Sequence, residues 1–180
     1  MKHLGQFRFK FKLDRNASKL LSEVGIGEGQ RILDFGCGSG TYSISAAKLV
    51  GKEGKIYSLD VNQRVLKNLL RKAKSEGLDN IVAILSSGNI GISIEDNTLN
   101  YVLLVDVLQE ISDKETLLKE IRRILKPDGL MTIYPMHMDA DEVIRLTSSM
   151  NFRLKKKIFQ EQILIFEEQI LIFEKSRKND

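Results

Sequence analysis

The chain has 180 residues, a net charge of +4 and 42% hydrophobic residues. This length fits one domain that buries about 70% of its unfolded surface, and no apolar run reaches the roughly 18 residues that a membrane span needs. The start, Met1 to Gln6, lacks the apolar core of a secretory signal, so we expect a cytoplasmic protein. A single cysteine, Cys37, excludes an internal disulfide framework and makes no metal site by itself.

The first 30 residues are expected to form an arm and a short helix. In Phe7 to Leu13, apolar and basic residues alternate with the period of a strand. This arm could pack its Phe face on the domain or act as a flap over a substrate. Asn16 is placed to cap a helix over Ala17 to Val24, which Gly25 to Gly29 would end.

The segment Arg31 to Gly40 predicts a strand, a tight turn and the start of a helix over Thr41 to Val50. An apolar run ends in Asp34, and glycines follow at positions 36, 38 and 40. Glycine permits positive φ and lets a ligand approach the main chain, and the first turn of a helix offers unpaired amide groups to polar or anionic atoms. We therefore expect a small-molecule site at this turn.

Asp34 indicates which ligand fits the turn. A carboxylate repels the pyrophosphate of a dinucleotide, and Thr41 stands where G-x-G-x-x-G needs its third glycine. A cationic ligand fits better, because a carboxylate pairs with an ammonium group. Asp60, which ends a second strand over Lys55 to Leu59, is placed to accept hydrogen bonds from ribose hydroxyls or to cap the next helix. Together these residues predict a nucleoside-containing cofactor.

Helices and strands alternate through the rest of the core. Helices are predicted over Gln63–Glu76 and Ala140–Met150, and a third begins at the capping box Ser112–Glu115 and ends at Leu125. Strands are predicted over Ile81–Leu85, Tyr101–Val105 and Leu130–Tyr134. This alternation predicts a doubly wound, mostly parallel sheet whose right-handed crossovers bring the loops to one edge. Asp106, Gln109 and Glu110 follow the fourth strand and are the best polar candidates to face cofactor and substrate.

Two patterns carry a resemblance to a known family. Asp34 followed by Gly36-Cys37-Gly38-Ser39-Gly40, and later a helix, the turn Lys126-Pro127-Asp128-Gly129 and an apolar strand, resemble class I S-adenosylmethionine-dependent methyltransferases of the ubiquinone and menaquinone C-methyltransferase type. The resemblance covers about residues 31 to 150. It implies a seven-stranded Rossmann-like sheet in the order 3-2-1-4-5-7-6, with an antiparallel last strand. One domain would then comprise an arm and helix (1–30), a cofactor-binding core (31–150) and a C-terminal hairpin (151–180).

The resemblance also implies roles for residues around the turn. Asp34 would hold the methionine ammonium of S-adenosylmethionine directly or through water, while Gly36, Cys37 and Gly38 would supply a close backbone surface. Asp60 would hold the ribose.

The resemblance also implies that the loops after the second and third strands bind the adenine. Val61 would lie against the adenine. In the family, an acidic residue after the third strand contacts the adenine amino group. Here Gly88 and Asn89 stand in that loop, and the side chain or main chain of Asn89 could replace the contact. Asp106 completes the expected cofactor site.

The C-terminus contains an identical repeat of seven residues. Glu161 to Glu167 recurs as Glu168 to Glu174, which indicates a local tandem duplication, because seven residues are too few for a repeat fold. Phe152 to Phe159 and one copy can form the hairpin that ends the resembled fold. We expect the second copy to be the last strand, while the other lengthens the hairpin, covers an edge or binds a partner.

The implied reaction is methyl transfer to a small metabolite or a quinone- or lipid-like acceptor, by analogy alone. A general base is needed only if the acceptor loses a proton, and Asp106, Glu110, His137 and Tyr134 are open candidates. A net charge of +4 does not indicate nucleic acid by itself. The alternatives are an RNA or protein methyltransferase, a cofactor-binding partner protein without catalysis, and an NAD-dependent oxidoreductase. A large acceptor, a second subunit of a homo-oligomer or the Phe7–Leu13 arm would close the site.

Overall fold

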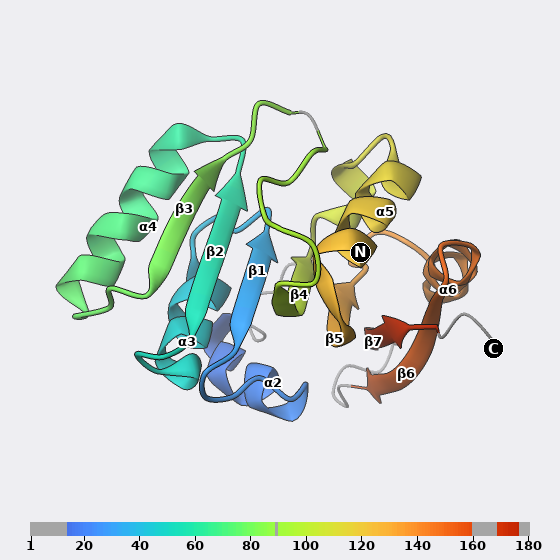
Figure 1. The fold of residues 1–180 in the computed structure, drawn as a ribbon, viewed down its shortest axis with the longest axis horizontal. Helices are drawn as coiled ribbons and strands as arrows, with labels where there is room; N and C mark the ends of the chain where they lie inside the picture. The colour runs from blue at the N-terminus through green and yellow to red at the C-terminus, as the bar shows by residue number, and fades with distance from the viewer. Residues whose placement is uncertain (1–13, 89, 160–168, 177–180) are drawn as a thin grey trace, which may run out of the picture.

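The computed structural model describes residues 14–88, 90–159 and 169–176. Its strands are β1 (Arg31–Phe35), β2 (Lys55–Asp60), β3 (Ile81–Leu85), β4 (Leu99–Val105), β5 (Leu125–Tyr134), β6 (Phe152–Phe159) and β7 (Gln169–Lys175). They form one sheet in the order β3-β2-β1-β4-β5-β7-β6 (Figure 1). The strands β1 to β5 are parallel, and β7 runs antiparallel to both β5 and β6. The predicted fold class and strand order are confirmed.

Helices cover both faces of this sheet. They are α2 (Ala17–Glu23), α3 (Thr41–Val50), α4 (Gln63–Ser75), the short 3-10 helix η1 (Leu108–Glu110), α5 (Lys114–Ile124) and α6 (Ala140–Ser149). Side chains of α2, α3 and α4 pack with Ile32 of β1, whereas those of α5 and α6 pack with its neighbour Leu33. Both residues are completely buried, as expected for a parallel strand covered on two faces. Among the described residues, no helix has the length and apolar character needed to cross a membrane.

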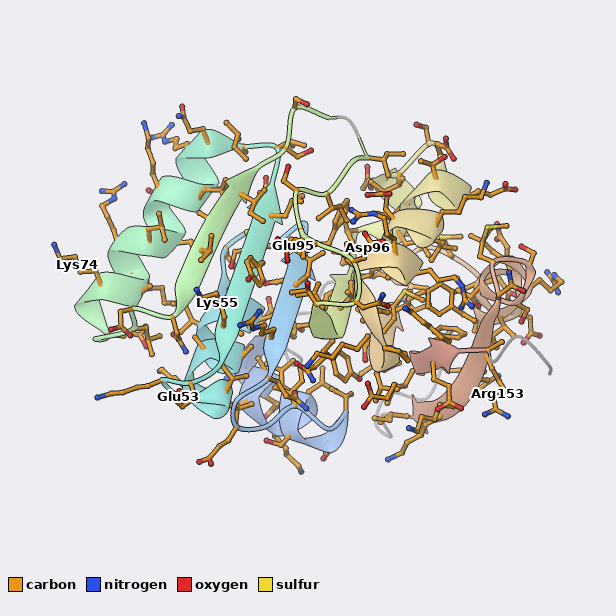
Figure 2. All side chains as sticks on the ribbon, in the orientation of Figure 1. Glu53, Lys55, Lys74, Glu95, Asp96 and Arg153 are labelled. Atoms are coloured by element: carbon orange, nitrogen blue, oxygen red, sulfur yellow. The ribbon has the colours of Figure 1, made fainter. Side chains whose placement is uncertain are left out.

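Charged side chains lie mainly around the outside of this layered core. Figure 2 shows Lys74 at the end of α4 and Arg153 on β6 pointing away from the sheet. The outer face of α4 is polar because its apolar positions, such as Leu66 and Leu69, are turned toward the sheet and buried.

The capping groups of two helices differ from the sequence predictions. Asn16 stands at the N-cap of α2, but its side chain makes no capping hydrogen bond. The capping box predicted Ser112 at the start of α5, yet the helix begins at Lys114 because Asp113 is the cap. The Asp113 carboxylate accepts a 2.9 Å hydrogen bond from the Thr116 amide. A carboxylate one residue later therefore replaces the serine as the capping group.

The predicted turn over Lys126–Gly129 lies within β5. This strand begins directly after α5, where Leu125 pairs with Leu99, and the register then shifts before Tyr101. A Cβ atom on Gly129 would lie 3.0 Å from the Leu99 carbonyl oxygen. The glycine therefore permits a close and irregular approach to β4 instead of marking a loop.

The second copy of the repeat forms β7, as predicted. Ile170 and Ile172 face the α3 side of the sheet, while Leu171 and Phe173 face the α5 side, and all four are at most 3% exposed. The first copy, residues 161–167, lies outside the described residues, and so does the N-terminal arm, residues 7–13.

Candidate functional site

A cavity of about 360 Å³ opens where the carboxyl ends of β1 to β4 meet. The residues that line it are Phe35, Gly36, Leu59, Asp60, Val61, Ser86, Gly88, Ile90, Asp106, Val107, Glu110 and Ile111. Their loops converge because parallel strands with right-handed crossovers end at one edge of the sheet. Five residues predicted for cofactor binding thus line this one cavity: Gly36, Asp60, Val61, Gly88 and Asp106.

A second cavity, of about 60 Å³, shares Gly36 with the first. Asp34, Cys37 and Gly38 line it, together with Asp14, Ser39, Tyr42 and Val105. The fold therefore brings the three remaining described residues of the predicted cofactor site to an adjoining space. Asn89, the last of the predicted set, lies outside the described residues.

Asp34 is a buried acid at the start of the glycine turn. It is 2% exposed on β1, and its carboxylate accepts a 2.6 Å hydrogen bond from the Ser43 hydroxyl of α3. The Ser58 hydroxyl of β2 donates in turn to Ser43 at 2.7 Å. Burial raises the pKa of Asp34 to about 6, although the hydrogen bonds from Ser43 oppose the shift. A cationic ligand in this cavity would stabilise the charged form.

Tyr42 supplies a buried hydroxyl to the same cavity. The residue is 6% exposed, and its hydroxyl lies near the Asp14 carboxylate without a hydrogen bond of good geometry to a described residue. Burial, and secondarily the nearby Asp14 carboxylate, raise the pKa of the Tyr42 hydroxyl, which is therefore a neutral donor. An unsatisfied buried hydroxyl costs about 1–3 kcal/mol, which a polar ligand atom would recover. Sequence reasoning missed Tyr42 because its position in α3 is typical of core, and missed Asp14 because no motif marks it.

The amides of the glycine turn are already used within the chain. Those of Gly36 and Cys37 donate to the Leu59 carbonyl at 2.8 and 3.0 Å, and that of Gly40 donates to Cys37 at 2.9 Å. The Gly38 amide donates to a carboxylate oxygen of Asp60 at 3.0 Å. These four amides are therefore not free for a ligand, whereas the unpaired amides expected from the sequence belong to the first turn of α3 and stay a prediction. The turn is fixed by these bonds, and carboxylate and hydroxyl side chains line the cavities beside it.

Gly36 lies at the boundary of both cavities. Its φ is +73°, and a Cβ atom there would lie 2.6 Å from Val107 Cγ2. Only a residue without a side chain therefore fits at position 36.

The adjacent free cysteine, Cys37, is buried. Burial raises its thiol pKa, so the thiol is protonated near neutral pH.

Asp60 connects the turn to the larger cavity. One carboxylate oxygen accepts from the Gly38 amide, and the other accepts from the Asn62 amide at 2.9 Å. Asn62, not Asp60, caps α4, because its side chain accepts from amides in the first helical turn. A carboxylate offers about four acceptor positions. Asp60 therefore retains positions for ligand hydroxyls while it fixes the turn.

The far wall of the larger cavity follows β4. Asp106 takes the unusual φ of +54°, and its carboxylate accepts a 2.7 Å hydrogen bond from Gln109. Glu110 lines the same wall. Of the four candidate bases, Asp106 and Glu110 thus face the cavity, whereas Tyr134 is buried in the core and His137 lies exposed beyond β5, and neither lines a described cavity.

Curated relatives of this chain are demethylmenaquinone methyltransferases. That of Geobacillus stearothermophilus is 33% identical over 111 residues, which cover 62% of this chain and 47% of the relative. That of Staphylococcus aureus strain MRSA252 is 26% identical over 141 residues, which cover 78% of this chain and 57% of the relative. The chain spans about half the length of these relatives.

Solved structures share the fold of this chain, and a family model identifies its class. A SAM-dependent methyltransferase from Aquifex aeolicus shares the fold with a TM-score of 0.78, at 24% identity and 90% coverage of each chain. A putative S-adenosyl-L-methionine-dependent methyltransferase from Methanococcus maripaludis has a TM-score of 0.72, at 20% identity and coverage of 99% and 91%. The family model for a methyltransferase domain matches residues 26–175. Since this match takes in most of the chain, the protein belongs to the methyltransferase domain family, the class I S-adenosylmethionine-dependent methyltransferases.

Proposed function

We propose that the protein binds S-adenosylmethionine across the two cavities and catalyses transfer of its methyl group to a small, apolar, quinone-like acceptor. One observation carries the cofactor placement. The carboxylates of Asp34 and Asp60 line adjoining cavities that share Gly36. Their chemistry suits a ligand with an ammonium group at one end and ribose hydroxyls nearby.

The smaller cavity suits the amino-acid end of the cofactor. Asp34 and Asp14 offer carboxylates to the ammonium group, and the Tyr42 hydroxyl is available to one of its polar atoms. A ligand ammonium would offset the cost of keeping Asp34 charged in a buried position, because an opposite charge nearby favours the ionised form.

The larger cavity suits the adenosine. Asp60 would accept hydrogen bonds from the ribose, while Val61 and Ile90 offer apolar contacts to the adenine ring. Val61 is 68% exposed, and a bound ring would cover part of that surface. Gly88 and Asn89 remain our assignment for the adenine amino group.

When bound, the cofactor supplies a methyl group that is activated by its positively charged sulfur. The contribution of the chain is to hold donor and acceptor in line and to keep water away, which can lower the barrier by several kcal/mol. Asp34 and Asp60 would hold the donor on the two sides of its sulfur, at the amino-acid group and at the ribose. The apolar side chains of Val107 and Ile111 limit the water beside the reacting atoms.

Two observations support a quinone-like acceptor. The curated relatives carry the name of an enzyme for demethylated menaquinone, and the cavity wall after β4 combines apolar Val107 and Ile111 with carboxylates. A ring carbon that gains a methyl group must lose a proton. Asp106 and Glu110 line this wall and are the candidates to accept it.

Binding tests the cofactor assignment first. Calorimetry should show that the full chain binds S-adenosylhomocysteine and does not bind NADH. The reverse pattern would contradict the proposal and favour an oxidoreductase.

Methyl transfer tests the acceptor. The chain is incubated with S-adenosylmethionine carrying a deuterated methyl group and a demethylated naphthoquinone with a short side chain, in reduced and oxidised arms. Mass spectrometry should find the label on the reduced ring. Parallel arms with total RNA and with a protein extract should remain unlabelled, and label found only in one of them would reassign the acceptor.

A further inference from the structure

The segment between β3 and β4 forms part of the larger cavity without belonging to a helix or strand. Ile90 lines the cavity, while Ile92 and Ile94 are buried in the hydrophobic cluster that includes α5. Such a segment has no regular pattern of main-chain hydrogen bonds to hold it. The position of its cavity-lining residue depends on what binds the backbone that follows.

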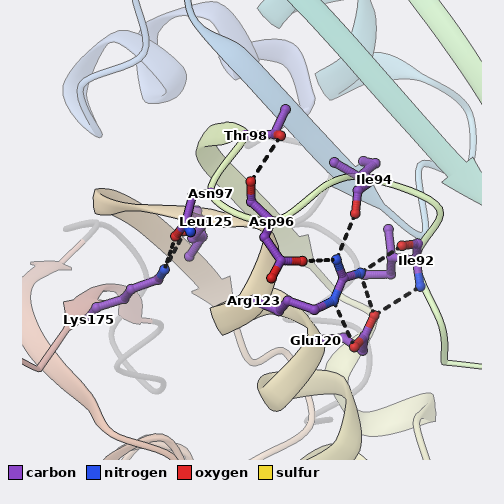
Figure 3. A network of polar contacts seen from close by, with 9 residues as sticks. All are labelled: Ile92, Ile94, Asp96, Asn97, Thr98, Glu120, Arg123, Leu125 and Lys175. Carbon is purple, nitrogen blue, oxygen red and sulfur yellow. Dashed lines mark hydrogen bonds and ion pairs between the residues drawn. The ribbon is translucent and has the colours of Figure 1, made fainter.

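Arg123, next to the last residue of α5, binds that backbone (Figure 3). Its guanidinium donates to the carbonyls of Ile92 and Ile94, both at 2.9 Å, and to the Asp96 carboxylate at 2.7 Å. Glu120, one turn earlier, accepts from the same guanidinium at 2.8 and 3.1 Å and accepts from the Ile92 amide at 3.2 Å. The planar donors of Arg123 thus join one helix to several points of the segment.

The main chain of α5 extends this attachment. The amides of Asn97 and Thr98 donate to the carbonyls of Arg123 and Ile124, each at 2.9 Å. The last carbonyls of a helix have no partner within the helix, so these bonds give a partner both to the helix carbonyls and to the amides of the segment. The segment is therefore tied to α5 at its middle by side chains and at its end by main chain.

We propose that Arg123 is a positioning residue for the cofactor: by holding residues 92–96 on α5, it keeps Ile90 in place on the cavity wall before the ligand binds. This inference rests on the proposed function, since it takes the larger cavity as the adenosine site. If the segment occupies its binding-competent position for only a fraction of the time, the apparent Kd rises by the inverse of that fraction. A lysine cannot replace Arg123, because one ammonium group lacks the planar set of donors.

Arg122 offers a matched control on the same helix. Its guanidinium also donates to two main-chain carbonyls, those of Asn151 at 2.6 Å and Ser176 at 3.3 Å. Asn151 precedes β6 and Ser176 follows β7, and neither residue lines the cavity. Losing these bonds should weaken the fold without moving the cavity wall.

The test compares Arg123→Lys with Arg122→Lys in the full chain. Calorimetry measures the Kd of S-adenosylhomocysteine, denaturant unfolding measures stability, and hydrogen exchange measures the opening of residues 90–98. We expect Arg123→Lys to raise Kd about tenfold and to speed exchange in this segment. Arg122→Lys should keep Kd within about twofold of the original value at a similar loss of stability.

An unchanged Kd in folded Arg123→Lys would overturn the inference while the proposed function stands. Failure of the unaltered chain to bind S-adenosylhomocysteine would instead remove the proposed function, and the inference with it. Should Arg123→Lys not fold, Glu120→Gln weakens the same network by removing one charge. That variant should raise Kd about threefold, and an unchanged Kd there counts equally against the inference.

Discussion

The Ser43 hydroxyl donates a 2.6 Å hydrogen bond to the buried carboxylate of Asp34 and thereby joins the start of α3 to the end of β1. The bond stabilises a charge that burial disfavours, and the pKa of Asp34 nevertheless rises to about 6. The group that would hold the ammonium of the cofactor therefore titrates near neutrality.

The affinity for cofactor should depend on the protonation of Asp34. Below a pH of about 6 the carboxyl is neutral and attracts a cation less, so the Kd of S-adenosylhomocysteine should rise up to about tenfold per pH unit. Calorimetry between pH 5 and pH 8, from about one unit below this pKa to about two units above it, measures this. Asp34→Asn should bind weakly at all these pH values, and a steep pH dependence that persists in this variant would contradict the prediction.

The stability of the unliganded protein should change with pH in the opposite sense. The folded chain holds the Asp34 proton with a pKa of about 6, whereas the ordinary pKa of an aspartate is 3.8. The stability that this bound proton contributes is therefore fully present below the ordinary pKa and is lost as the pH rises through the pKa of the folded chain. The resulting change in the free energy of unfolding is at most about 3 kcal/mol. Denaturant unfolding should show Asp34→Asn to be more stable than the original chain near pH 8, about two units above this pKa.

Tyr42→Phe should separate ligand binding from folding. The Tyr42 hydroxyl lies near the Asp14 carboxylate but makes no hydrogen bond of good geometry to a described residue, so its removal should change stability by no more than about 1 kcal/mol. If the hydroxyl binds the amino-acid end of the cofactor, Kd should rise about fivefold. Calorimetry and denaturant unfolding of the same preparation give both values.

Tyr101→Phe is the control for this prediction. The Tyr101 hydroxyl is buried and bonded to the Val24 carbonyl at 3.0 Å and to Thr132 at 2.7 Å. Its loss should cost about 1–2 kcal/mol of stability without changing Kd. Equal effects of the two substitutions on Kd would argue against a ligand contact for Tyr42.

Gly36→Ala should lower the stability of the fold more than Gly29→Ala does. Both glycines have a φ of +73°, but only the Cβ at position 36 would meet another side chain, at 2.6 Å from Val107. Strain alone costs about 1–2 kcal/mol, and the overlap should add about 1–3 kcal/mol. Denaturant unfolding checks this order, and adding Val107→Ala should restore part of the loss. No recovery in the double variant would mean that the overlap is not the cause.

Asp60→Ala should raise the Kd of S-adenosylhomocysteine about 30-fold, because the carboxylate both fixes the Gly38 amide and faces the cavity. Asn62→Ala removes the cap of α4 and should cost about 1 kcal/mol of stability with little change in Kd. If the two variants bind equally well, Asp60 has only a structural role.

Much of the fold could be predicted because each buried strand carries its own signal. The apolar run ending in Asp34 and the alternation of helices and strands specify a parallel sheet, and the sheet edge then brings Asp60 and Asp106 together. These features depend on local periodicity and on general rules of handedness. Position along the chain was therefore enough to place them.

The contacts of the polar groups could not be predicted in the same way. The amides of Gly36 and Cys37 bind Leu59, a residue of another strand, and Arg123 binds carbonyls of a distant segment. Such partners are set by how the elements pack. Local patterns also leave helix ends uncertain by a residue, since the cap of α5 is Asp113 and not the predicted Ser112.

The two copies of the repeat could in principle compete for one place in the sheet, since their side chains are the same. The copies differ only in the residues that flank them, so these residues must determine which copy joins the sheet. Lys175 donates to the Leu125 carbonyl and the Ser176 amide donates to Asn151, whereas the residues after the first copy are Glu168 and Gln169. Removing either copy yields one and the same polypeptide, in which two residues would separate the paired ends of β6 and β7, the shortest common hairpin connection. The repeat therefore lengthens the chain between β6 and β7, whereas both cavities lie at the sheet edge built from β1 to β4.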